Sequence, residues 1–168
     1  MRTEPLPSQI FVNHRESLRS LLKPGALVVV QPNDIYPTNA DGTLPYQQQS
    51  DLMHLTGIRQ EETILLMMPD AVDERDREIL FVRKTSETIA VWEGHKLSKD
   101  QAREQSGIQR VEWTEEFEGI FQRLAMQAER IYLASNEHPR STQIVATRND
   151  RFTQQCREKF PLHRFERL

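Results

Sequence analysis

Three runs made up mainly of apolar residues constrain the fold of this chain more than any other feature. They span residues 26–30, 63–69 and 78–82, and β-branched or long aliphatic side chains dominate each of them. Runs without polar alternation are typical of strands that are covered on both faces. Only the acidic turn at 70–76 separates the second run from the third, so these two are expected to pair as an antiparallel hairpin. The candidates for further strands are 111–113, 131–134 and 160–168.

Amphipathic helices are predicted between these strands. In residues 9–22, Phe11, His14, Leu18 and Leu21 recur at helical spacing on one stripe, whereas Arg15 falls on the wet side. The other helices are predicted at 98–107, 114–125 and 148–159. Strands interleaved with helices indicate an α/β protein with a mixed sheet flanked by helices on both faces. At 168 residues the chain is expected to be a single domain, 1–168.

The run from Tyr46 to Gly57 packs an aromatic ring, three amides and a helix start into twelve residues. Ser50 or Asp51 is expected to cap a short helix, and Gly57 is expected to end it in the left-handed conformation. So short a helix is unstable alone and must be held by packing. Before it, residues 32–45 are rich in turn residues and are long enough to suggest a binding role.

The charge and the termini exclude several classes of protein. A net charge of -3 argues against a nucleic-acid partner. No apolar run approaches the roughly 18 residues of a membrane span, and the amino terminus lacks the blocks of a signal peptide, so a cytoplasmic location without membrane contact is expected. The single cysteine, Cys156, excludes an internal disulfide and is expected to be a buried thiol.

A search for catalytic chemistry gives no candidate catalytic or metal-binding residue. The five histidines stand far apart and the six glycines are solitary, which leaves no HExxH motif and no phosphate-binding loop. The aspartates Asp70, Asp73 and Asp76 lack the glycine of a calcium loop, so a solvated hairpin tip is expected there. Asp51 and His54 could form a polar pair on the short helix, but such pairs are usually caps or surface contacts.

An ordered set of motifs resembles the N-terminal domain of aminopeptidase P, over roughly residues 9–134. The set consists of Phe11-Val12-Asn13-His14-Arg15, Pro24-Gly25, Asn39 and Asp41, Tyr46-x-Gln48-x-Ser50-Asp51, Leu55-Thr56-Gly57 and Trp92-Glu93-Gly94. Gln47, Gln49, Leu52 and His54 depart from the usual pattern of that family. The resemblance implies the ribonuclease H-like fold of the creatinase and aminopeptidase P N-terminal domain.

The same resemblance implies that this domain is part of a larger enzyme. Its relatives are Xaa-Pro aminopeptidases, which remove an N-terminal residue that precedes proline. Their C-terminal "pita-bread" catalytic domain holds two manganese ions and is absent from this chain, so this fragment alone is expected to bind no cofactor and to be inactive. The domain's implied partners are the catalytic domain, peptides with proline at the second position, and further copies in a homodimer or tetramer.

The resemblance also assigns candidate site residues. Trp92 would reach a neighbouring subunit's pocket and select substrates by size, and ordinary packing is the alternative. Tyr46 and Asp51, with Gln48 and Ser50, would either scaffold their loop or touch a partner, and scaffolding is favoured. Two other classes of function stay open. One is a stand-alone peptide- or histone-binding module of the same fold, and the other is a nuclease that uses Asp34, Asp41 and Asp51.

Overall fold

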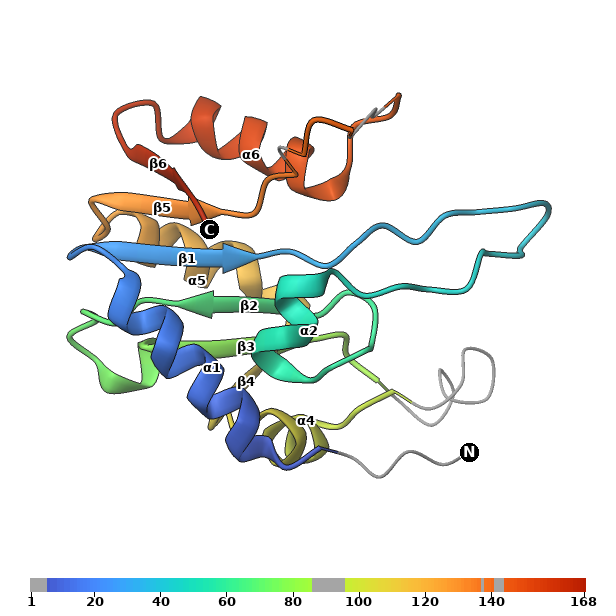
Figure 1. Cartoon of the computed structure of the whole chain (residues 1–168), viewed down its shortest axis with the longest axis horizontal. Helices are drawn as coiled ribbons and strands as arrows, with labels where there is room; N and C mark the ends of the chain where they lie inside the picture. The colour runs from blue at the N-terminus through green and yellow to red at the C-terminus, as the bar shows by residue number, and fades with distance from the viewer. Residues whose placement is uncertain (1–5, 86–95, 137, 141–143) are drawn as a thin grey trace.

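The computed structural model describes residues 6–85, 96–136, 138–140 and 144–168 (Figure 1). Helices and strands alternate along the chain as the sequence predicts. In chain order they are α1 Ser8–Leu21, β1 Ala26–Val30, α2 Ser50–Thr56, β2 Ile64–Met67, the 3-10 turn η1 Glu74–Asp76, β3 Glu78–Val82, α4 Lys99–Ser106, β4 Arg110–Trp113, the 3-10 turn η2 Thr114–Glu116, α5 Phe117–Ala125, β5 Arg130–Leu133, α6 Arg148–Lys159 and β6 Arg164–Arg167.

The six strands form one mixed sheet in the order β4-β3-β2-β1-β5-β6. Strand β2 runs antiparallel to both of its neighbours, and the other three pairings are parallel. Val28 of β1 faces Met67 on one side and Tyr132 on the other. The predicted hairpin of β2 and β3, the interior place of β1 and the final strand β6 are therefore confirmed.

Helices cover both faces of the sheet, as expected. On one face, α5 and α6 pack on a core that includes Leu27 and Val29 of β1. On the other, α1, α2 and α4 pack on a core that includes Val28 and Val30. Successive residues of β1 point to opposite faces, so a strand covered on both sides needs an apolar residue at every position. All five residues of β1 are buried.

Helix α1 departs from its predicted stripe at two positions. Leu21, expected inside, is 80% exposed, and Arg15, expected on the wet side, is 1% exposed. The Arg15 guanidinium donates from one nitrogen to the carbonyls of Leu55 at 2.8 Å and Ser106 at 3.0 Å, and from Nε to Glu78 at 3.1 Å. Arg15 is buried because the last turns of α2 and α4 present unpaired carbonyls to α1, and a cation satisfies them.

The two helices that meet Arg15 end in the same way. In Thr56-Gly57-Ile58 and in Ser106-Gly107-Ile108 the hydroxyl donates to the carbonyl four residues earlier and accepts from the isoleucine amide. Both glycines have positive φ, +71° and +75°, which confirms the predicted left-handed end at Gly57. A β-carbon on Gly57 would lie 2.3 Å from the Phe11 ring, so this glycine also permits the close approach of α1.

The acidic turn between β2 and β3 is exposed at residues 72–75, as its composition predicts, but Asp76 departs from that prediction. Asp76 is only 4% exposed and pairs with Arg110 and with Arg123, the latter at 2.8 and 2.9 Å. The Asp70 carboxylate accepts from the Gly25 amide at 2.8 Å, which ties the turn to the start of β1. The turn is therefore anchored to three other elements by ionic and polar contacts.

Candidate functional site

The predicted site residues lie on segments that leave one edge of the sheet. Because β1, β3, β4, β5 and β6 run in the same direction, their carboxyl ends meet at a single edge, called the carboxyl edge below. Strand β1 is followed there by the segment that carries Tyr46 and leads to Asp51. Strand β3 is followed by the segment that carries Trp92, which lies outside the described residues. In sheets of this kind, ligand sites form at the carboxyl ends of parallel strands.

Tyr46 scaffolds its own loop. Its hydroxyl donates to the Gln48 side-chain oxygen at 2.7 Å, and that oxygen also accepts from the Gln49 amide at 2.9 Å. The Gln48 side-chain nitrogen donates to the carbonyls of Gln60 at 2.8 Å and Ile58 at 3.3 Å. Burial raises the pKa of Tyr46 to about 12, so the phenol stays protonated and keeps donating.

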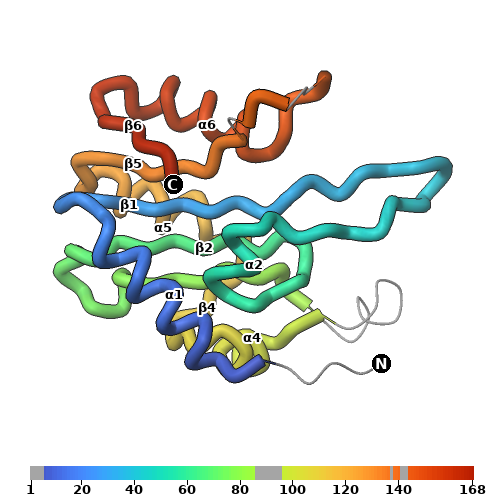
Figure 2. The backbone as a smooth tube through the Cα atoms, viewed as in Figure 1, coloured from blue at the N-terminus to red at the C-terminus, as the bar shows by residue number. Residues whose placement is uncertain are grey.

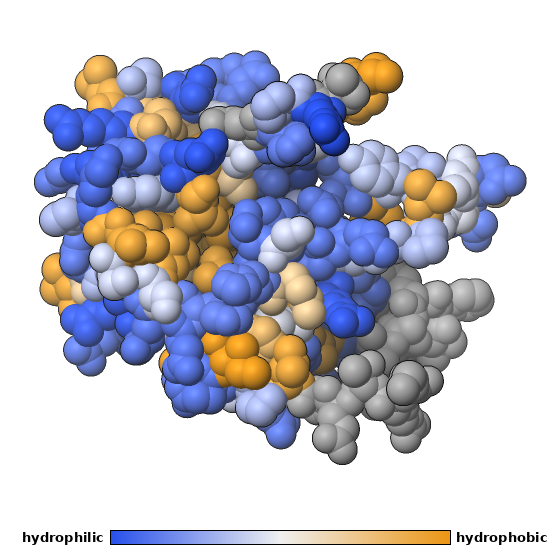
Figure 3. Space-filling view, viewed as in Figure 1, coloured by the Kyte–Doolittle hydropathy of each residue, from blue (hydrophilic) through white to orange (hydrophobic). Residues whose placement is uncertain are grey.

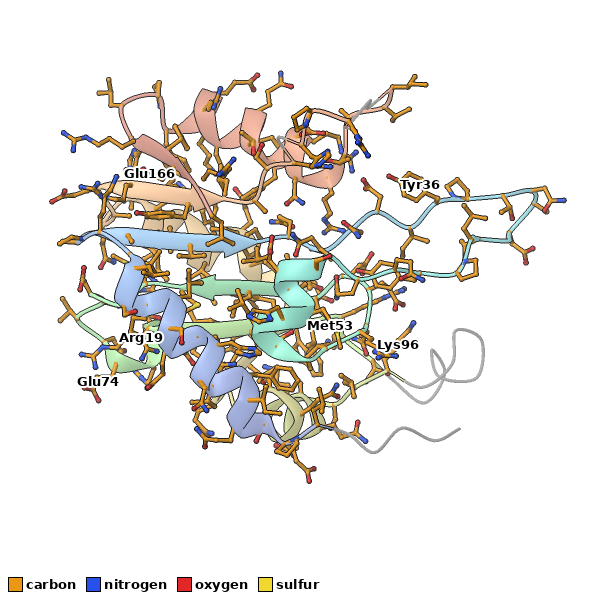
Figure 4. The ribbon with its side chains drawn as sticks, viewed as in Figure 1. Arg19, Tyr36, Met53, Glu74, Lys96 and Glu166 are labelled. Carbon is orange, nitrogen blue, oxygen red and sulfur yellow. The ribbon has the colours of Figure 1, made fainter. Side chains whose placement is uncertain are left out.

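The same network reaches the segment that follows the Trp92 loop. The Gln60 side-chain oxygen accepts from the Leu97 amide at 2.7 Å, and Lys96 pairs with Glu61 in a largely buried salt bridge (Figure 4). Burial is the largest single influence and acts to raise the pKa of Glu61, but the hydrogen bond from Lys96, a backbone hydrogen bond and the charges of Lys96 and Arg83 together leave that pKa below its usual value. The loop at 46–49 and the chain after the Trp92 segment are therefore fixed to one another.

Asp51 is exposed and faces a polar crevice of about 440 Å³ at the carboxyl edge. Asn33, Gln49 and Asp51 line it from the β1 side, and Ser135, Thr147 and Asp150 line it from the β5 side. The crevice lies where β1 leads to α2 on one face of the sheet and its parallel neighbour β5 leads to α6 on the other. This is the topological switch point of the sheet.

The cap of α2 differs from the prediction. Neither Ser50 nor Asp51 caps the helix, because Gln49 occupies the N-cap position and its side-chain oxygen accepts from the Leu52 amide at 2.7 Å. Asp51 instead accepts from the Gln49 side-chain nitrogen at 2.7 Å, which orients that cap. Asp51 therefore orients the Gln49 side chain that caps the helix, and Asp51 itself remains exposed to solvent.

Residues 32–45 form a projecting arm, which Figures 1 and 2 show extending beyond the carboxyl edge. Its two legs are joined by hydrogen bonds from Thr38 to Gly42 at 2.8 Å and from Leu44 to Tyr36 at 2.9 Å. Ile35, Tyr36 and Leu44 are 40%, 50% and 54% exposed, and apolar side chains are visible along the arm in Figure 3. An isolated two-stranded ribbon is marginal in water, so contact with another surface would stabilise this arm.

The described residues contain no metal centre. Among them, no group of three or more His, Cys, Asp or Glu side chains is placed to hold a metal ion. The nuclease set also fails there, because Asp34 pairs with Arg151 at 2.5 Å and accepts from the Arg148 amide at 2.8 Å. Nothing places Asp34 with Asp41 and Asp51 around one ion.

Two further expectations concern the single cysteine and membrane-spanning helices. Cys156 is buried, as predicted, and burial raises the pKa of its thiol to about 12, which disfavours the reactive thiolate. Within the described residues, no helix combines the length and the apolar character that crossing a membrane requires.

Sequence reasoning missed two contacts that hold α1 against α2. One is the Arg15 network, and the other is a pair of histidine rings, His14 and His54, which stack with centroids 3.7 Å apart. The His14 Nδ1 also lies 2.8 Å from the His54 carbonyl. The pattern of a hydroxyl residue, glycine and isoleucine occurs at the end of both α2 and α4. This repeated pattern in the sequence indicates that the two helix ends could share one hydrogen-bond donor, which is Arg15.

The architecture defines the class of this protein. It is a mixed α/β domain with two helical layers, whose projecting and polar segments gather at one sheet edge and whose described residues carry no metal centre. The model of the family described as "Aminopeptidase P, N-terminal domain" matches residues 11–132, and the chain belongs to this family.

Individual relatives agree with this assignment. The chain is 27% identical over 137 residues to the Xaa-Pro aminopeptidase of Escherichia coli and 21% identical over 141 residues to that of Haemophilus influenzae. These matches cover 82% and 84% of the chain but only 31% and 32% of the relatives.

Solved structures show the same fold. An aminopeptidase P structure from Bacillus anthracis matches with a TM-score of 0.85 and 21% identity, over 96% of this chain and 38% of that one. The low-pH form of the E. coli enzyme matches with a TM-score of 0.74 and 24% identity, over 94% and 34%. These likenesses confirm the predicted mixed sheet with its flanking helices.

Proposed function

We propose that this chain is the non-catalytic N-terminal part of a manganese-dependent Xaa-Pro aminopeptidase, where it assembles subunits and narrows the entrance to the active site. Cleavage of the bond before proline would belong to a catalytic domain, which would also hold the metal ions. The full protein would act in the cytoplasm on peptides with proline at the second position.

The observation that carries this proposal is the gathering of projecting segments at the carboxyl edge. The arm presents Ile35, Tyr36 and Leu44 to solvent, although large exposed apolar groups on one projection are unfavourable unless a partner covers them. Strand β3, which the Trp92 segment follows in the chain, ends at the same edge. An exposed apolar arm at this edge suits a domain that contacts a neighbouring subunit, and the family resemblance adds Trp92 as the residue that would line the path of its substrate.

The assembly role is tested in the full-length protein by replacing Ile35, Tyr36 and Leu44 together with serine. A matched control replaces Val72, Met126 and Leu162, which are 95%, 69% and 96% exposed at the opposite edge. Light scattering after gel filtration should show a smaller assembly for the arm variant and an unchanged one for the control. An unchanged assembly in both variants would remove the arm from the interface.

The gating role is tested by Trp92→Ala in the full-length protein. We expect KM to rise, or discrimination between short and long Xaa-Pro peptides to weaken, while metal content stays the same. Kinetics that stay unchanged across peptides of different length would reject gating by Trp92, and this result is independent of the arm experiment.

A further inference from the structure

The opposite edge of the sheet contains a charged groove that the proposed function does not use. It is a cavity of about 790 Å³ at the amino ends of β3 and β4, bordered by the η1 turn, α1, α4 and α5. Its cationic lining consists of Arg19, Arg75, Arg77, Lys99, Arg103, Arg110 and Arg123. Its carboxylates are Asp73, Glu74, Asp76, Glu78 and Glu112. Seven cations against five carboxylates leave an excess of two positive charges, on a chain whose net charge is -3.

The excess falls to one positive charge when the charged neighbours that pair with the lining are included. Arg15 pairs with Glu78, whereas Glu16 pairs with Arg19 and Asp100 pairs with Arg103, so the neighbours add one positive and two negative charges. The acidic residues with shifted pKa values are held in the charged form. Hydrogen bonds from Arg123 first, and from Arg110, hold the pKa of Asp76 below its usual value. The positive excess is therefore present at neutral pH.

The groove has a rigid floor. Asp76, at 4% exposure, bridges Arg110 and Arg123, and Glu112 bridges Arg110 at 3.1 Å and Lys99 at 2.8 Å. Lys99 also lies 4.9 Å from the centre of the Trp113 ring. These linked pairs fix three cations in place before any ligand arrives, and a preformed site loses little entropy on binding.

The walls carry cations in weaker pairs. Arg75 in the η1 turn and Arg77 directly after it are 81% and 44% exposed, and their partners Asp73 and Glu74 are 43% and 80% exposed. Arg103 of α4 stands 39% exposed on the other wall, with Asp100 as its partner at 90% exposure. Exposed pairs contribute little, about 0–1 kcal/mol, so these arginines can exchange a carboxylate for a ligand. Figure 4 shows Arg19 and Glu74 on this side of the molecule.

We propose that this groove binds a small polyanion, a ligand with two or more adjacent phosphate or carboxylate groups. The arginine fork matches both oxyanions in bidentate geometry, and two walls of arginines over a cationic floor favour a ligand that carries several charges. The cavity volume lies in the range of small-molecule sites, which is about 300–1,000 Å³. The site lies at the opposite edge of the sheet from the arm, so it is separate from the proposed assembly surface.

The proposal is tested by titrating pyrophosphate and, separately, citrate into the protein at matched ionic strength, with acetate as the monovalent comparison. We expect saturable binding of pyrophosphate or citrate, and the stronger of the two identifies the anionic group. Acetate should not bind measurably.

The site is located with the variant Arg77→Gln/Arg103→Gln, which removes one cation from each wall and leaves the floor intact. Its charge-matched control is Arg140→Gln/Arg157→Gln, two exposed arginines away from the groove. We expect the groove variant to weaken binding at least tenfold and the control to change it less than twofold, with both variants folded by circular dichroism. No saturable binding to the unmodified protein, or equal weakening in the two variants, would overturn the proposal.

Discussion

Replacing Arg15 with methionine removes the only charge on the buried side of α1 while nearly preserving the length of the side chain. The guanidinium is 1% exposed and makes three hydrogen bonds, to the carbonyls of Leu55 and Ser106 and to the Glu78 carboxylate. In Arg15→Met, two helix-end carbonyls lose their donor in a site without water access. Glu78 is less affected because Arg19 still donates to it at 2.5 Å.

The expected loss is large for a single substitution. Removing one member of a buried charged network typically costs about 3–5 kcal/mol. The whole domain is stable by about 5–15 kcal/mol, so the variant is expected to stay folded but to lose a sizeable part of its stability. At about 2–4 °C per kcal/mol for a chain of this size, Tm should fall by about 6–20 °C.

Urea unfolding followed by circular dichroism measures this loss directly. Arg15→Met should lower the midpoint at constant slope, and Arg15→Lys should lose less, because an ammonium reaches some of the acceptors but lacks the fork. Arg19→Met is the control on the same helix. Its side chain is 36% exposed, so the loss should be about 0–1 kcal/mol. If Arg15→Met costs no more than Arg19→Met, the guanidinium does not hold the ends of α2 and α4.

Three other substitutions and one chemical treatment test separate features of the structure. Gly57→Ala should lower the free energy of unfolding by about 2–4 kcal/mol, because φ is +71° and a β-carbon would collide with the Phe11 ring. Gly119→Ala has open space around the new atom and should raise the free energy of unfolding by about 0.5–1 kcal/mol. Urea unfolding measures both changes. The lowered pKa of Asp76, caused first by hydrogen bonding to Arg123, should contribute stability above its unfolded pKa of about 3.9 that is lost as pH falls below that value, and Asp76→Asn should flatten the stability curve there. The thiol of Cys156, with its pKa raised to about 12, should resist iodoacetamide at pH 8 in the folded protein and react promptly in urea.

Periodicity, length and residue type together were sufficient to predict most elements of this fold. The apolar run in β1 is too short for a typical helix and contains three valines, which favours a strand covered on both faces. The caps were less predictable. Ser50 and Asp51 are stronger N-cap residues than glutamine, yet Gln49 occupies the N-cap position of α2. The Gln48 side-chain oxygen accepts from the Gln49 amide, and the helix begins earlier than a cap at Ser50 or Asp51 would allow.

The environment of a charged residue could not be predicted from the sequence where its partners lie in distant parts of the chain. Hydropathy places Arg15 in water, but its acceptors lie 40, 63 and 91 residues away, and no local pattern shows carbonyls that need a donor. Asp76 was misplaced for the same reason, since Arg110 and Arg123 lie 34 and 47 residues further along. In the candidate site, the Tyr46 to Gln48 contact is two residues apart and agrees with the favoured scaffolding role.

The direction of the strands explains how one small sheet can carry two independent surfaces. With β1, β3 and β5 running in the same direction, the long segments that follow these strands at 31–49, 83–98 and 134–147 all begin at the carboxyl edge, which is where we propose contacts with a neighbour or a substrate. The amino edge receives short turns and the last turns of helices, where cations are favoured by the helix dipoles. The short, arginine-rich turns at the amino ends of β3 and β4 therefore form an ionic groove. Substitutions in the arm should leave anion binding in this groove unchanged. That independence is itself measurable, because the serine variant of the arm should bind pyrophosphate or citrate as the unmodified protein does.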